Sequence, residues 1–288
     1  DNGRSGNRNA LFLIYYAYRN NPTVIDYMRH LFTSVADENN PTAQFLLGKH
    51  LISHGEYNDV IKGIEYLVKA VANKSNDALY LLGQYYMSGD MVEYGIQEDH
   101  SLGIKLYESA AANGSSESQI ALINALLDSN EFHSAISYAK ESINQGNISA
   151  YYPLGICYLK MMHYPGDLFC QKGIKCLHQG NQHSSVECTT LLAMIYHEGI
   201  LTVKDEFKAY NFYQDLVNRN HIKYVYNNIG VMLKNGSECV NQDILLAIEY
   251  FEEAIKMEND IFAIFNLSKI YFYGQRIPVD VRQASSKL

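Results

Sequence analysis

The stretch that decides the fold runs from Ala78 to Ala110; it begins with ALYLLGQYY and ends with LGIKLYESA. In both blocks the apolar residues recur at intervals of three and four, which places them on one face of a helix. Gly83 and Gly103 stand inside these patterns, although glycine within a helix costs about 1 kcal/mol relative to alanine. Close approach of a second helix, which a larger side chain would block, offsets that cost. The stretch therefore predicts two amphipathic helices packed as a pair.

Both blocks recur along most of the chain. Copies of the first block begin at Ala43, Ala150, Cys188, Val225 and Ala263, with a weaker copy from Glu117. Their shared small position is held by Gly48, Gly83, Gly155, Ala193, Gly230 and Ser268, and by Ile123 in the weaker copy. The steps between these positions are 35, 40, 32, 38, 37 and 38 residues, which is the period of helix-pair repeats. The sequence thus predicts an all-α solenoid of helix-turn-helix units.

The connection between the two helices is longer than in a tetratricopeptide repeat. From the small residue of the first helix to that of the second, the spacings are 15, 20, 12, 18, 16, 17 and 16 residues. Four connections contain a glycine followed by an aspartate: Gly89 and Asp99, Gly199 and Asp205, Gly236 and Asp243, Gly274 and Asp280. An aspartate there can accept hydrogen bonds from the free backbone N–H groups that begin a helix. With these features the chain resembles the Sel1-like repeat family, a relative of the tetratricopeptide repeat; the third copy, with a spacing of 12, departs from that pattern.

The resemblance implies a right-handed α/α superhelix of Sel1-like, tetratricopeptide-like repeats. Residues 43–288 are expected to hold about six and a half repeats, the last one truncated. Residues 11–42 read as a degenerate N-terminal helix pair, with helices around 11–19 and 22–36, and residues 1–10 as a disordered or added N-terminal stretch. Because Sel1-like proteins act as adaptors in several kinds of complex, the resemblance also implies a scaffold that binds other proteins.

Composition narrows the classes of partner. The chain has 23 basic and 31 acidic residues, a net charge of −8, which repels nucleic acid and anionic lipid. The longest apolar run, residues 10–17, is far shorter than the roughly 20 residues that a membrane-spanning helix needs. No phosphate-binding glycine loop, metalloprotease motif or nucleophile elbow is present in the sequence. We therefore expect a protein or peptide partner, with no cofactor and no catalysis.

The compartment stays open at this point. The five cysteines are odd in number and irregularly spaced, which argues against a disulfide framework and slightly favours the cytoplasm. Five asparagines begin glycosylation triplets, which keeps a secreted or lumenal location open: Asn73, Asn113, Asn147, Asn235 and Asn266.

Likeness to tetratricopeptide arrays also implies where a partner would bind. The groove of such arrays is lined by first-helix residues two before and two after the leucine position. These residues combine aromatic anchors with adaptable polar groups, as protein interfaces do. The candidates are Phe45, Lys49, Tyr80, Gln84, Asn124, Tyr152, Ile156, Thr190, Met194, Asn227, Phe265 and Lys269, with Ile120 and Val231 at the remaining positions.

One group of residues suggests an alternative function, an accessory factor that binds a metal or a small ligand. Five side chains competent to bind zinc fall within nineteen residues: Cys170, Cys176, His178, His183 and Cys188. Their spacing matches no known zinc motif. Cys176 lies on the apolar stripe of a second helix and Cys188 in the apolar pattern of a first helix, so packing is the competing interpretation.

Overall fold

The computed structural model describes residue 15 and residues 32–219, 225–258 and 260–273, and all regular structure within these ranges is helical. The expected helices at 11–19 and 22–36 fall largely outside the described residues. Of them, Tyr15 and residues 32–36 are helical, and the helix that contains residues 32–36 runs on to Asp37. Residues 1–10 and the part of the last half-repeat that follows Tyr273 lie outside the described residues as well. The prediction of an all-α array of helix pairs is confirmed.

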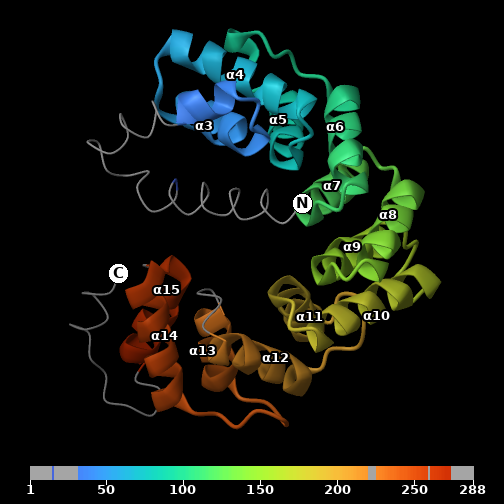
Figure 1. The fold of residues 1–288 in the computed structure, drawn as a ribbon. Helices are drawn as coiled ribbons and strands as arrows, with labels where there is room; N and C mark the ends of the chain where they lie inside the picture. The colour runs from blue at the N-terminus through green and yellow to red at the C-terminus, as the bar shows by residue number, and fades with distance from the viewer. Residues whose placement is uncertain (1–14, 16–31, 220–224, 259, 274–288) are drawn as a thin grey trace. The chain divides into compact units, whose positions relative to one another are not determined.

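The chain divides into two compact units, residues 1–138 and 139–288, with the division inside helix α8. The first unit contains α3 (Pro41–His54), α4 (Tyr57–Ala72), α5 (Asn76–Ser88), the short helix η1 (Val92–Tyr94), α6 (His100–Ala112) and α7 (Ser116–Asp128), and the start of α8 (Phe132–Asn144). The second contains the rest of α8, η2 (Ile148–Ala150), α9 (Tyr151–Lys160), α10 (Leu168–Gln182), α11 (Val186–Glu198), α12 (Glu206–Asn218), α13 (Val225–Asn235), α14 (Ile244–Glu258) and α15 (Ile261–Tyr273). Successive helices form the pairs α3–α4, α5–α6, α9–α10, α11–α12 and α13–α14 (Figure 1).

The repeated small residues lie where two helices of a pair meet. A methyl group placed on Gly48 would approach the backbone oxygen of Gly63 to 2.7 Å, and one on Gly63 would approach that of Gly48 equally closely. On Gly230 it would meet the ring of Phe251 at 2.6 Å. Since real side-chain carbons do not come this close, an alanine at any of these positions would force the neighbouring atoms to move. The explanation of the small positions by close helix approach is confirmed.

The glycine and aspartate residues of the connections end and begin helices as predicted. Gly89 and Gly199 follow α5 and α11 in the left-handed conformation, with φ of 68° and 69°. Asp99 and Asp205 precede α6 and α12, and each carboxylate accepts a hydrogen bond of 2.9 Å from a backbone N–H group three residues on. These caps fix the register at which each second helix starts. Gly274 and Asp280 lie outside the described residues.

Each unit has its own hydrophobic core. The leucine position before the small residue supplies buried side chains in every described copy: Leu47, Leu82, Leu122, Leu154, Leu192, Ile229 and Leu267. Three residues after the small position, Tyr158 and Tyr196 are buried, whereas Tyr86 and Tyr271 are half-buried. In the described part of the chain, no helix combines the length and apolar character needed to cross a bilayer.

Candidate partner-binding surfaces

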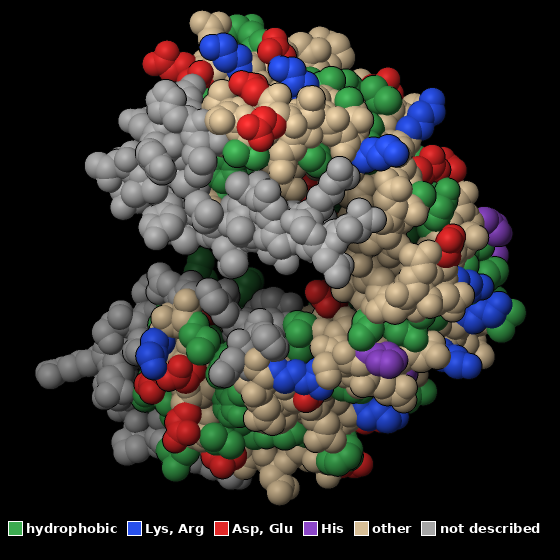
Figure 2. Space-filling view, viewed as in Figure 1, with side chains coloured by type: hydrophobic (Ala, Val, Ile, Leu, Met, Phe, Trp, Pro, Cys, Tyr) green, Lys and Arg blue, Asp and Glu red, His purple; other side chains and the backbone are tan. Residues whose placement is uncertain are grey.

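The predicted groove residues lie on the first helices, and two apolar members of the row are well exposed. Met194 on α11 is 47% exposed, although its neighbours Ala193 and Ile195 are buried. Phe265 on α15 is 48% exposed, and Leu267, two residues on, is fully buried. On the visible face of the molecule, apolar side chains are interspersed with charged ones (Figure 2). Phe265 lies one helical turn from Ile261 and Phe262, which are exposed as well, and a group of exposed apolar side chains is typical of a contact surface.

Within three of the first helices, the two groove residues lie beside each other, one turn apart. The Nζ atom of Lys269 lies 4.3 Å from the ring centre of Phe265, and that of Lys49 lies 6.0 Å from the ring centre of Phe45. On α5 the amide of Gln84 donates a hydrogen bond of 3.1 Å to the Tyr80 hydroxyl. Each pair holds an aromatic ring beside a polar group, as the i,i+4 spacing allows.

Other predicted groove residues are engaged inside the protein. Phe45 is only 7% exposed and belongs to the core of the first unit, so it offers little surface despite the prediction. The Thr190 hydroxyl donates a hydrogen bond of 2.8 Å to the Val186 carbonyl of its own helix. Tyr152 and Ile156 are half-buried, and Asn124 is exposed. The candidate row is therefore discontinuous, with its most open apolar members on α11 and α15.

Helices α13 and α15 share a polar contact that sequence reasoning did not find. The Asn266 amide donates a hydrogen bond of 3.1 Å to the side-chain oxygen of Asn227, and Lys234 Nζ lies 3.4 Å from Asn266 Oδ1. Burial and the neighbouring Lys269 lower the pKa of Lys234. Asn227, a predicted groove residue, thus contributes to holding two first helices together.

Of the five cysteine and histidine side chains of the alternative, three contact different partners and two are buried thiols. The Cys170 thiol donates to the Leu201 carbonyl at 3.4 Å, His178 Nε2 lies 3.0 Å from the Tyr196 hydroxyl, and the His183 ring stacks on Tyr151. Cys176 and Cys188 are buried, and burial raises the pKa of each thiol to about 11. A metal needs the thiolate form, so this environment favours packing. Across the described ranges, no group of three such side chains is placed to hold a metal ion.

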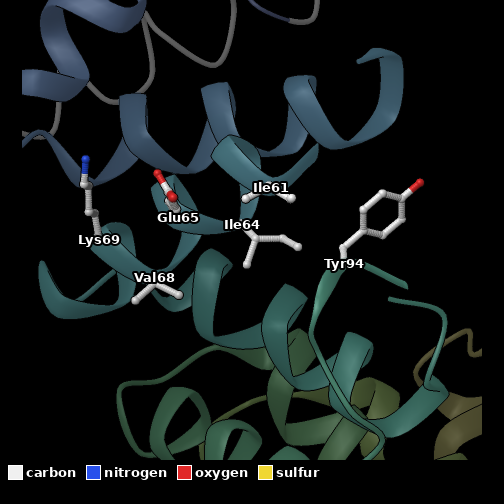
Figure 3. Close-up of a pocket in the computed structure, with 6 residues that line it drawn as sticks. All are labelled: Ile61, Ile64, Glu65, Val68, Lys69 and Tyr94. Atoms are coloured by element: carbon white, nitrogen blue, oxygen red, sulfur yellow. The ribbon is translucent and has the colours of Figure 1, made fainter. Parts of the chain in front are cut away.

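The structure also contains an apolar pocket that the sequence analysis missed. Ile61, Ile64 and Val68 of α4 line it together with Tyr94 of η1, and Glu65 and Lys69 form its polar part (Figure 3). Tyr94 reaches α4 because the connection between α5 and α6 is the longest of the array, and its ring lies 5.3 Å from that of Tyr57. The signal was visible: Tyr57, Ile61, Ile64 and Val68 follow a helical period on the face next to the core stripe, one residue on from Val60, Gly63 and Leu67.

Comparison with known proteins decides the family. The model of the Sel1 repeat matches residues 41–75, 76–115, 186–215, 224–259 and 261–284, more than half of the chain. The chain belongs to the Sel1 repeat family. Residues 116–185, which include the third copy with its short spacing, lie between the matched segments. No curated protein matches the chain.

Two solved structures show the same fold at low sequence identity. The Sel1 repeat protein from Oxalobacter formigenes is 19% identical, with a TM-score of 0.59 over 83% of this chain and 95% of that one. The protective antigen c5321 of uropathogenic Escherichia coli, which displays an SLR fold, is 16% identical, with a TM-score of 0.58 over 98% of this chain and 68% of that one. The predicted Sel1-like solenoid is thereby confirmed. Proteins with such repeats are typically scaffolds for protein interactions.

Proposed function

We propose that this Sel1 repeat protein is a non-catalytic scaffold that receives a segment of a partner protein along its first helices. The observation that carries the proposal is the exposure of Met194 and Phe265, two apolar residues of the predicted row, at 47% and 48%. Methionine adapts its shape to a partner, and an aromatic ring supplies large contact area at low entropic cost. Lys269, held beside Phe265, adds a polar group at the edge of the same contact.

The charge of the chain supports a protein partner over a nucleic acid. A net charge of −8 opposes attraction to a phosphate backbone. The alternative of a metal-binding or ligand-binding factor gains no support from the cysteine and histidine residues, because Cys170, His178 and His183 contact different partners and burial raises the pKa of the Cys176 and Cys188 thiols. The first-helix row therefore remains the surface on which the proposal rests.

The test uses affinity capture from the organism's own extract with quantitative mass spectrometry. The wild type is compared with Met194→Glu and Phe265→Glu, and with Val203→Glu as a matched control, since Val203 is 85% exposed in the connection before α12. We expect a set of proteins recovered by the wild type and by Val203→Glu to be lost with both groove variants. Circular dichroism checks that all variants keep their helix content. Equal recovery by all four proteins contradicts the proposal.

A further inference from the structure

Two neighbouring clusters of three side chains in the second unit, which we call grooves, come from equivalent repeat positions. In each, the first residue lies on the second helix of a repeat, five positions after the small residue of that helix. The second is a tyrosine on the first helix of the next repeat, three positions after the small residue there. The third residue directly precedes the small residue of the following second helix. In the groove between α10 and α12 these are His178, Tyr196 and Lys208; between α8 and α10 they are Lys140, Tyr158 and Lys172.

In the groove between α10 and α12, the positive charge of the lysine is neutralised by a carboxylate of the same chain. Lys208 Nζ lies 4.9 Å from the ring centre of Tyr196 and 2.9 Å from Asp205 Oδ2, so a carboxylate balances the lysine above the ring. His178 Nε2 lies 3.0 Å from the Tyr196 hydroxyl. The Lys208 ammonium, the Tyr196 hydroxyl and His178 Nε2 thus each have a partner supplied by the chain.

The groove between α8 and α10 has the same ring and an uncompensated charge. Lys140 Nζ and Lys172 Nζ lie 5.9 Å and 5.8 Å from the ring centre of Tyr158. Among the described residues, neither lysine forms an ion pair, and the Tyr158 hydroxyl has no hydrogen bond. Lys140 and Lys175 both act to lower the pKa of Cys176 against the effect of burial, which places a third ammonium group near the same spot. Two lysines above one ring repel each other unless an anion lies between them.

The missing carboxylate has a structural cause. Asp205 caps α12 three residues before Lys208, so the two side chains share a face of the helix. Asp167 caps α10 but stands five residues before Lys172, which turns it away from that lysine. Its carboxylate instead accepts hydrogen bonds from the backbone N–H groups of Cys170 at 2.7 Å and His163 at 2.8 Å, and these lower its pKa. The start of α10, two residues earlier relative to the small residue, leaves Lys172 without an internal carboxylate, although its ammonium group also lies 5.7 Å from the ring centre of Phe169.

We propose that the groove of Lys140, Tyr158 and Lys172 binds an acidic segment of a partner protein, with a glutamate or aspartate carboxylate between the two ammonium groups. The neighbouring groove shows that a carboxylate is the group that satisfies a lysine in this geometry. Helices α8–α10 carry four lysines and two acidic residues between 132 and 183, in a chain whose net charge is −8. Lysine and histidine side chains lie along the edge of the view that α8 and α10 occupy (Figure 2). A local basic surface on an acidic protein attracts a short acidic peptide and repels long polyanions.

The first experiment measures binding of a fluorescein-labelled peptide of eight glutamates by anisotropy at low salt. We expect the double variant Lys140→Gln with Lys172→Gln to bind about tenfold more weakly, since each exposed ion pair contributes a few-fold in affinity. The matched control is Lys62→Gln with Lys105→Gln, which removes the same charge from exposed positions on α4 and α6. Lys62 precedes Gly63 as Lys172 precedes Gly173. Equal weakening by both double variants, or none by either, overturns the proposal.

Two further measurements decide the class of anion and the origin of the site. A matched peptide with phosphoserines tests the ligand: binding of this peptide alone, with none of the glutamate peptide, contradicts a carboxylate-bearing partner. Asp205→Asn keeps the cap of α12 but frees Lys208, so we expect it to raise the number of glutamate peptides bound per chain. An unchanged number counts against the carboxylate argument. Thermal melts of all variants confirm folding, and Met194→Glu should bind the peptide as the wild type does, which separates this surface from the first-helix row.

Discussion

Helix pairs α3–α4 and α13–α14 use glycine at the same repeat position for two different reasons. In α3–α4 two glycines face each other, and a methyl group on Gly48 would meet the backbone oxygen of Gly63 at 2.7 Å. In α13–α14 the second helix has Ala247 at the small position, and the obstacle to a methyl group on Gly230 is the ring of Phe251. In the first pair, contact between the two helix backbones opposes a larger residue than glycine. In the second pair, the position of the Phe251 side chain does so.

The difference matters because a side chain can move and a backbone within a helix cannot without moving the whole helix. The pair α11–α12 illustrates the side-chain case. It already has Ala193 at the small position, and its aromatic residue, Tyr213, is buried at the place that Phe251 occupies in its own repeat. One repeat position thus accepts glycine or alanine, depending on what the second helix presents.

The largest effect that separates the two cases is expected from Gly48→Ala. The methyl group would press on the Gly63 carbonyl and on Leu67 at 3.1 Å, and overpacking of this kind costs about 1–3 kcal/mol. This outweighs the gain of about 1 kcal/mol in helix propensity. Chemical denaturation should therefore show lower stability than the wild type, while Lys49→Ala, the next residue on the same helix, should stay within about 0.5 kcal/mol. A Gly48→Ala variant as stable as the wild type would show that the two backbones are not in contact.

A smaller effect is expected from Gly230→Ala. The added methyl group requires the ring of Phe251 to shift. The neighbouring repeat, which has Ala193 at this position and a buried Tyr213, shows that an aromatic residue can pack beside alanine here. The gain in helix propensity offsets much of the cost of the shift. We expect the free energy of unfolding to change by less than about 1 kcal/mol, measured under the same conditions as for Gly48→Ala. A loss as large as that of Gly48→Ala would erase the distinction between the two pairs.

The repeat and its close contacts were predictable from sequence because they depend on spacing alone. A glycine that recurs within an apolar helical pattern can be recognised without knowing its partner, and Gly48 and Gly83 are such cases. The caps formed by Asp99 and Asp205 follow from the same local rules. These features involve residues of one helix pair, whose geometry the period of the repeat already determines.

The solvent exposure of the predicted groove residues could not be predicted from the sequence to the same degree. Phe45 and Phe265 occupy one repeat position, yet Phe45 is 7% exposed and Phe265 is 48% exposed. Their exposure depends on what packs over the first helix from other parts of the chain, which the repeat pattern does not encode. The basic groove was missed for a related reason: only the side-chain positions show that Asp205 pairs with a lysine, whereas the carboxylate of Asp167 is taken up by backbone N–H groups.

The smallest effect concerns the position held by His178 in one groove and by Lys140 in the next. Burial and the nearby Lys208 lower the pKa of His178 below its ordinary value of 6.5. The unfolded chain then takes up a proton near pH 6.5 while the folded chain does so only at lower pH, so stability falls as the pH drops through this window. The melting temperature of the wild type should therefore fall further between pH 7.5 and 5.5 than that of His178→Gln, by about 1–3 °C. Lys140→Gln, at the equivalent position, should keep the wild-type pH dependence; if His178→Gln keeps it too, His178 is not the group that titrates.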